Sequence, residues 1–161
     1  MSSHVSPTPP DWLRACGLHL TATCVRPDAL ADPVSARLLE IGLEQACREA
    51  GVTLLGWVAL PGSLDLLTPE GARPERWQRL LGRIKGAHGR RDNRRVGRTG
   101  AVWRPGSRIR FVRRGDLERA RTVLHERPVR AGLAERAADW PFSSWRAVHE
   151  GAVPGFVERR C

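Results

Sequence analysis

Apolar and polar residues alternate over residues 18–25, and an alternation of this kind predicts a strand. The even-numbered positions are apolar and would share one face of that strand. His19, Thr21 and Thr23 would share the other face. The two faces should therefore meet different surroundings.

Three later segments also predict strands. Residues 52–60 and 63–67 are largely apolar and flank Pro61-Gly62, so the pair is expected to form a hairpin. Residues 107–113 predict the fourth strand of the set.

A helix is predicted between the first two strands. Asp32 is a suitable N-cap, Pro33 suits the first helical position, and Gly51 follows the predicted last residue, Ala50. The residues expected on its buried face are Leu38, Leu39, Ile41, Leu43 and Ala46.

Two more helices are predicted in the second half of the chain. The first covers about residues 74–91 and has an apolar stripe made of Trp77, Leu80, Leu81, Ile84 and His88. The other follows Gly115-Asp116 and reaches about Glu126, and its inward residues are Leu117, Ala120 and Leu124.

Loops complete the predicted order. Residues 94–106 should form a basic loop around Trp103, and residues 128–145 should form short turns. The aromatic side chains expected to anchor those turns in the core are Trp140, Phe142 and Trp145.

The order β-α-β-β-α-β predicts an α+β fold of the ferredoxin-like (split β-α-β) kind, an antiparallel sheet with helices packed on it. A chain of 161 residues suffices for one hydrophobic core. We therefore expect a disordered N-terminal lead (residues 1–16), one domain (17–147) and a C-terminal tail (148–161).

Composition excludes several classes of protein. The chain has no apolar stretch of the roughly 18 residues that a membrane span needs, and its Pro-rich start lacks the apolar segment of a secretory signal. The four cysteines (16, 24, 47 and 161) show no paired spacing, so reduced thiols in the cytoplasm are expected, with Cys24 and Cys47 buried. No cofactor and no metal site built from cysteine is predicted.

Positive charge is concentrated in one part of the chain. Residues 1–72 carry four arginines and eight acidic residues, a net charge of −4, whereas residues 73–121 carry sixteen arginines and Lys85 against four acidic residues, a net charge of +13. Arginine forks bind phosphate in a bidentate way and stack on bases. A GC-rich genome would explain the excess of arginine over lysine but not this segregation, which indicates nucleic-acid binding.

The predicted nucleic-acid contacts follow this basic segment. Trp103 has two interpretations, stacking on an unpaired base or filling the core. The candidate residues are Arg83, Lys85, Arg90, Arg91, Arg94, Arg95, Arg98, Trp103, Arg104, Arg108 and Arg110.

Several motifs resemble those of a known family. Leu18-His19-Leu20-Thr21 is similar to the family's opening strand, and Lys85-Gly86 followed by Asn93-Arg94-Arg95 and by residues 97–103 is similar to its stretch Lys-Gly-x-Tyr…Asn-Arg-Arg-x-Gly-x-x-Gly-x-x-Trp. Residues 124–133 (LHERPVRAGL) and 139–146 (DWPFSSWR) resemble a further signature. Over residues 17–147 the chain resembles the REP-associated tyrosine transposases, a branch of the single-tyrosine HUH (IS200-like) transposases.

The resemblance implies an altered active site. Family members cut single-stranded DNA through a covalent phosphotyrosine, but this chain contains no tyrosine, and the family's nucleophile position corresponds to His88. The family's two metal-binding histidines correspond to Ser63 and Asp65, where serine is a poor ligand and one aspartate binds Mg²⁺ weakly. We expect a transposase-family protein that binds single-stranded or hairpin DNA and is inactive in cleavage and transposition, as a regulatory relic or the product of a decaying gene.

Alternatives remain open at this stage. One is a metal-dependent endonuclease that uses water or His88 as nucleophile, with Mg²⁺ or Mn²⁺ at Asp65 helped by Asp92 or His88. Another is an RNA-binding or protein-interaction module. His19 is a ligand or a structural histidine, Asn93 caps its helix or binds metal, and His125 belongs to the core or a turn. The protein is a monomer or a homodimer.

Overall fold

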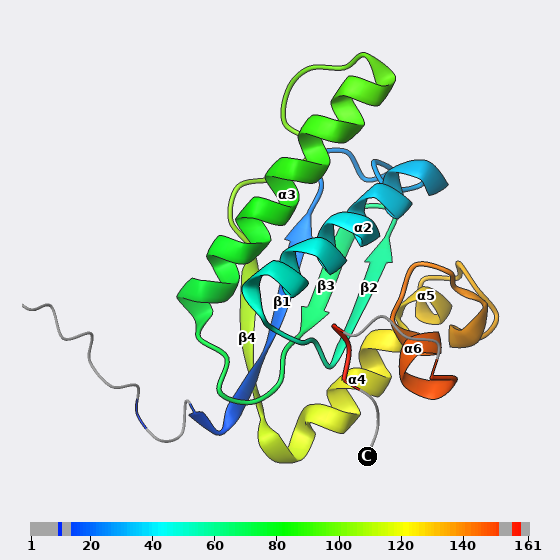
Figure 1. Ribbon diagram of the computed structural model, residues 1–161. Helices are drawn as coiled ribbons and strands as arrows, with labels where there is room; N and C mark the ends of the chain where they lie inside the picture. Colours follow the sequence, from blue (N-terminus) through cyan, green and yellow to red (C-terminus); the bar gives the residue numbers. More distant parts are fainter. Residues whose placement is uncertain (1–9, 11–13, 152–155, 159–161) are drawn as a thin grey trace, which may run out of the picture.

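A four-stranded antiparallel sheet, with two long helices across one face, forms the body of the protein (Figure 1). The computed structural model describes residue 10, residues 14–151 and residues 156–158. The predicted α+β fold and its order β-α-β-β-α-β are confirmed. The strands, in the spatial order β2-β3-β1-β4, are β1 (Cys16–Thr23), β2 (Gly56–Leu60), β3 (Ser63–Leu67) and β4 (Arg108–Arg113), and the long helices are α2 (Pro33–Ala50) and α3 (Pro74–Val96).

Some predictions concern residues that the structure does not describe. Most of the N-terminal lead (residues 1–9 and 11–13) and Cys161 lie outside the described residues. None of the described helices combines the length and apolar character needed to cross a membrane.

The central strand β1 separates two chemically different faces. Its residues Leu18, Leu20 and Ala22 are buried in the main core, beneath α2 and α3. Thr21 lies opposite Asp65 of β3 on one side and Arg108 of β4 on the other, while His19 lies opposite Arg110. Since directly opposed residues of an antiparallel pair point to the same face, these polar side chains gather on the face away from α2 and α3.

Helix α2 begins and ends as its capping residues predict. The Asp32 side chain accepts a hydrogen bond from the Val34 amide at 2.9 Å, and Gly51 ends the helix with a left-handed φ of 64°. The prediction that Ile41 is buried is wrong, because its side chain is 44% exposed. Leu39 and Leu43 face the sheet, and a residue two positions from each lies on the opposite side of a helix.

Helix α3 is longer than its apolar stripe predicts. It reaches Val96 instead of ending near Arg91, and Gly97 closes it with a φ of 66°. Buried Asp92 continues the stripe one turn beyond His88. The prediction of a loop from residue 94 failed because this last turn buries a charged side chain, which hydrophobic periodicity cannot detect.

A smaller core covers part of the opposite sheet face. After the short 3₁₀ turn η1 (Arg114–Asp116), helix α4 (Leu117–His125) packs against β2 and β3. Its Leu117 and Leu124 form a cluster with Leu55, Val58 and Leu67. Because α4 packs mainly against β2 and β3, part of the face formed by β1 and β4 is left open.

The C-terminal segment follows as α5 (Arg127–Arg130), η2 (Ala137–Asp139) and α6 (Trp145–His149). The aromatic anchors are half-buried: Trp140 and Phe142 pack against the two cores, and the Trp140 Nε1 donates to the Ala59 carbonyl at 2.9 Å. The Trp145 ring stacks on His149, with ring centroids 4.3 Å apart. These contacts hold the segment beside the β2 edge of the sheet (Figure 1).

Candidate nucleic-acid interface

An open pocket of about 610 Å³ lies over the exposed part of the sheet, and we call it the arginine pocket. Its walls come from β1, β4, the β2–β3 turn, α4 and α5. A volume of this size is typical of small-ligand sites. The lining residues are His19, Thr21, Thr23, Leu60, Ser63, Arg108, Arg110, Val123, Arg127, Arg130 and Ala131.

Asp65 lies beneath this pocket and is completely buried. Its Oδ1 accepts hydrogen bonds from His19 Nε2 at 2.8 Å and from Thr21 Oγ1 at 2.7 Å. Its Oδ2 forms an ion pair with the Arg127 guanidinium and accepts no hydrogen bond from the described residues. The buried carboxylate therefore holds side chains from β1 and α5 in one place.

The hydrogen-bond chain continues to the edge strand. Arg110 Nη2 donates to His19 Nδ1 at 2.8 Å, so the imidazole proton must lie on Nε2, the atom that faces Asp65. This histidine is thus a structural link between a carboxylate and an arginine. The alternative of His19 as a metal ligand does not fit this arrangement, because both of its ring nitrogens are engaged within the protein.

The pocket carries surplus positive charge. Its lining includes four arginines (Arg108, Arg110, Arg127 and Arg130) and no acidic residue. Asp65 below can balance only one of these charges. The Thr23 and Ser63 hydroxyl groups add hydrogen-bond donors on the same surface. Guanidinium and hydroxyl donors together form a site suited to phosphate oxygens.

The positions assigned to metal-binding histidines by resemblance do not fit a divalent cation. Ser63 and Asp65 do face the same side of β3, as alternate strand residues must. However, Ser63 offers only a hydroxyl group, and the Asp65 oxygens face an arginine, an imidazole N–H and a threonine hydroxyl. Among the described residues, no three His, Cys, Asp or Glu side chains are grouped to hold a metal ion.

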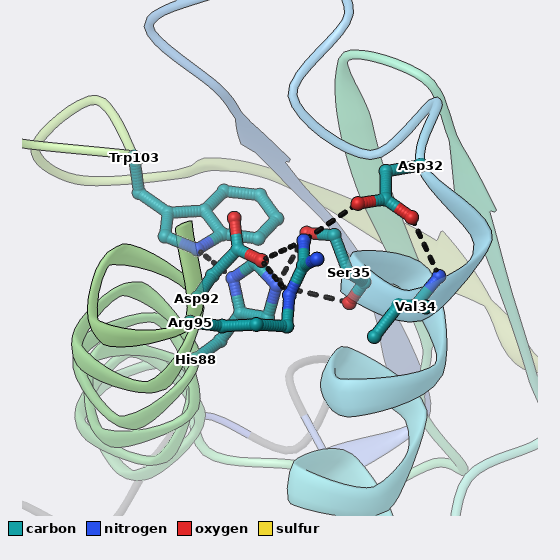
Figure 2. Close-up of polar contacts among 7 residues, drawn as sticks. All are labelled: Asp32, Val34, Ser35, His88, Asp92, Arg95 and Trp103. Carbon is teal, nitrogen blue, oxygen red and sulfur yellow. Dashed lines mark hydrogen bonds and ion pairs between the residues drawn. The ribbon is translucent and has the colours of Figure 1, made fainter. Parts of the chain in front are cut away.

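His88 lies on the other side of the sheet, in a buried cluster between α2 and α3 (Figure 2). Its Nδ1 accepts a hydrogen bond from Trp103 Nε1 at 3.0 Å, and its Nε2 lies 3.1 Å from the Ser35 carbonyl and 3.2 Å from Ser35 Oγ. Burial lowers the pKa of His88 below its ordinary value, which keeps the ring neutral. The residue is 2% exposed, so a DNA strand cannot reach it in this conformation.

Arg95 closes the same cluster from the solvent side (Figure 2). It pairs with Asp92 at 2.9 Å and with Asp32, the N-cap of α2, at 2.6 Å. The Val34 amide and then Arg95 hold the pKa of Asp32 below its usual value, and the two carboxylates raise the pKa of Arg95. Arg95 was predicted to contact nucleic acid, but its guanidinium is committed to joining the two helices.

Two other predicted contacts also have structural partners. Trp103 is 7% exposed and belongs to the core, so no base can stack on it here, and the core interpretation is the one that holds. Lys85 Nζ donates to the carbonyl oxygens of Arg104 and Gly106 at 2.9 Å and 2.6 Å, and burial lowers its pKa. Its side chain thus fastens the loop after α3 to the helix. Asn93 Nδ2 likewise donates to the loop, at the Gly100 carbonyl, at 2.8 Å.

The remaining predicted arginines form a second basic surface. A groove of about 640 Å³ between α2 and α3 is lined by the predicted Arg83, Arg90 and Arg91, together with Arg79, which was not among the predicted contacts. Arg83 makes a 3.3 Å ion pair with Glu49 across it. Arg94 and Arg98 are also exposed near the end of α3, and Arg104 is exposed on the loop that returns alongside Lys85. The basic segment is therefore divided, since Arg108 and Arg110 belong to the arginine pocket on the opposite sheet face.

Sequence reasoning missed part of the pocket. Arg127 and Arg130 were not assigned a role, although they lie three positions apart in the motif from Leu124 to Leu133 that carries the family resemblance. Their spacing places both on one face of a helical turn. His125, from the same motif, is buried and lies 2.8 Å from Ser144 Oγ, so of its two predicted places, the core or a turn, the structure shows the core.

Comparison with known proteins supports the fold. No protein-family model matches the chain, and no curated protein matches it. A solved structure of the REP-associated tyrosine transposase bound to a REP hairpin is similar, with a TM-score of 0.65 and 18% identity over 98% of this chain and 99% of that chain. A candidate transposase from Deinococcus radiodurans R1 is 22% identical over 74% of this chain and 96% of that chain, with a TM-score of 0.48. The first of these likenesses shows that the chain has the fold of a transposase.

Proposed function

We propose that this protein is a transposase-like DNA-binding protein that binds single-stranded or hairpin DNA and does not cleave it. The similar transposase was solved with a hairpin bound, and the net charge of +13 over residues 73–121 suits a polyanionic partner. We further propose that it acts in the cytoplasm.

One observation carries the proposal that cleavage is absent. The Asp65 oxygens, at the position implied for metal binding, are engaged by His19, Thr21 and Arg127. The position implied for the nucleophile, His88, is a buried neutral imidazole on the other side of the sheet. A nucleophile and a metal separated by a sheet cannot act on one phosphate, because both must contact the reacting group.

The test is a binding and cleavage experiment on the purified protein. Fluorescence anisotropy would follow a labelled DNA hairpin with a single-stranded flank across salt concentrations, with matched duplex and RNA hairpin as competitors. We expect salt-dependent binding that prefers the flanked DNA hairpin, and no nicked product with Mg²⁺ or Mn²⁺. A covalent protein–DNA adduct or a nicked strand would contradict the proposal, as would equal, weak binding to every nucleic acid.

A further inference from the structure

We propose that the arginine pocket binds a backbone phosphodiester group of DNA without a metal ion, through Arg108, Arg110, Arg127 and Arg130. This inference rests on the proposed function, and it assigns the main contact between the protein and DNA to these four side chains.

The side chains of the arginine pocket are already held in place without a ligand. Asp65 is completely buried and pairs with Arg127, while its hydrogen bond with His19 leads on to Arg110. One guanidinium group is thus held directly by the buried anion, and a second is held through His19. Groups already ordered lose less conformational entropy on binding, which favours affinity.

Positive charge in the arginine pocket is not balanced by acidic side chains. One carboxylate faces four guanidinium groups, and no acidic side chain is among the lining residues. In the described parts of the chain, no carboxylate lies within ion-pair distance of Arg108 or Arg130. A site with this surplus attracts an anion, and forked donors match the oxygens of a phosphodiester.

The arginine pocket is accessible to a DNA strand. The pocket is open to solvent, and Arg108 and Arg130 are exposed at opposite walls of it, on β4 and α5. Thr23 and Ser63, which lie opposite each other on β1 and β3, also line the pocket and offer hydroxyl groups. An extended strand can therefore pass over the sheet with one phosphate in the pocket, whereas the closed cluster around His88 admits nothing.

The experiment removes two positive charges from the pocket without touching the Asp65 network. The variant is Arg108→Gln with Arg130→Gln, and its matched control is Arg73→Gln with Arg113→Gln, two exposed arginines outside the pocket. Binding of the labelled flanked hairpin would be measured by anisotropy in EDTA and in Mg²⁺. Circular dichroism would check that all variants fold.

The pocket variant should bind about tenfold more weakly, and the control variant about twofold more weakly, with wild-type binding retained in EDTA and no stronger in Mg²⁺. The slope of log affinity against log salt should fall by about two in the pocket variant. Equal losses in both variants, or loss of wild-type binding in EDTA, would overturn the inference. Failure of the wild-type protein to bind any DNA would instead overturn the proposed function.

The same guanidinium and hydroxyl donors could bind a free phosphate ion. A second titration distinguishes this ligand from a DNA phosphodiester. Inorganic phosphate would be titrated into the wild type and the pocket variant by calorimetry at constant ionic strength. We expect binding far weaker than that of the hairpin. Tight phosphate binding that the pocket variant loses while keeping its DNA affinity would assign the pocket to a free anion and overturn the inference.

Discussion

The cluster around His88 and the pocket over Asp65 occupy the two positions that the family resemblance assigns to strand cleavage, yet the sheet separates them. Both are networks of polar side chains from elements far apart in the sequence. In the first, Trp103, His88 and Ser35 satisfy one another in a neutral, buried arrangement. In the second, a buried anion is surrounded by arginines that reach solvent.

The comparison shows how the same kinds of residue serve stability in one place and binding in another. A buried neutral network contributes to the fold and exposes no donor to a ligand. A buried carboxylate beneath an excess of guanidinium groups both stabilises the fold and presents positive charge outward. Changes in the two regions should therefore separate stability from DNA affinity.

The largest effect is expected from His88→Ala. The substitution leaves a cavity between α2 and α3 and deprives Trp103 Nε1 and the Ser35 carbonyl of their partner. We expect the free energy of unfolding to fall by about 3 kcal/mol. Affinity for the DNA hairpin, measured on the folded fraction, should change by less than about twofold because the cluster is remote from the pocket. Urea unfolding followed by circular dichroism measures the first quantity.

His88→Gln is the matched control for that substitution. A glutamine side chain can both accept from Trp103 and donate to the Ser35 carbonyl, so it should recover much of the lost stability. A large loss of DNA binding in both variants, with the fold intact, would show that His88 contacts the ligand and would end the contrast between the two regions.

Arg127→Met should give the next largest effect. It should lower both the free energy of unfolding and the affinity for DNA. Removing the guanidinium leaves the buried Asp65 carboxylate without its ion-pair partner. Arg127 is 34% exposed, so water can replace part of this interaction, and we expect a loss of about 2 kcal/mol in the free energy of unfolding. DNA affinity should fall as well, because a pocket charge is lost.

Arg130→Met provides the comparison, since Arg130 lines the same pocket one helical turn away without contacting Asp65. It should lower DNA affinity and leave the urea midpoint unchanged within experimental error. Equal destabilisation by both substitutions would mean that the Asp65 ion pair contributes nothing specific to stability.

Capping and alternation allowed the sequence to predict much of the fold. Asp32 and Gly51 mark the ends of α2 by local chemistry, and the alternation over residues 18–25 places His19 and Thr21 away from the main core. Such features depend on neighbouring residues and can be read from one segment. Alternation on β3 likewise placed Ser63 and Asp65 on one face.

The partners of the polar groups could not be predicted in the same way. The Asp65–Arg127 ion pair joins β3 to a four-residue helix, and the Trp103–His88 hydrogen bond depends on how a loop returns to α3. Both contacts depend on tertiary packing, which leaves no repeating pattern in a single sequence. For the same reason the sequence predicted a single basic surface from residues 73–121. In the structure the sheet separates Arg108 and Arg110 from the arginines of α3.

The pH dependence of stability tests the neutral state of His88. In the unfolded chain histidine titrates near pH 6.5, whereas burial lowers the pKa of His88 in the folded protein. Below about pH 6.5 the unfolded state binds a proton that the folded state does not, so stability falls as the pH falls, by at most about 1.4 kcal/mol per pH unit. The Ser35 carbonyl and Asp92 oppose this lowering of the His88 pKa and Arg95 adds to it, and the net direction remains downward.

Urea unfolding of the wild type and of His88→Gln at several pH values measures this dependence. The difference in the free energy of unfolding between the two proteins should shrink as the pH falls toward 5.5, about one unit below the ordinary histidine pKa. A constant difference would show that His88 is not the group responsible. A difference that grows would mean that the folded protein prefers a charged imidazole.

The smallest effect is expected on the second basic surface. Arg90→Gln with Arg94→Gln removes two exposed charges from α3, outside the arginine pocket and outside the Arg95 ion pairs. Exposed charges are screened by salt, and without a buried counterion to orient them they should weaken hairpin binding by only about two- to threefold. The loss should be the same for duplex and flanked hairpin, because phosphate contacts of this kind carry no sequence or shape information. If this variant instead lost more affinity than Arg108→Gln with Arg130→Gln, the groove beside α3 would be the principal DNA site, and the ordered network over Asp65 would serve stability alone.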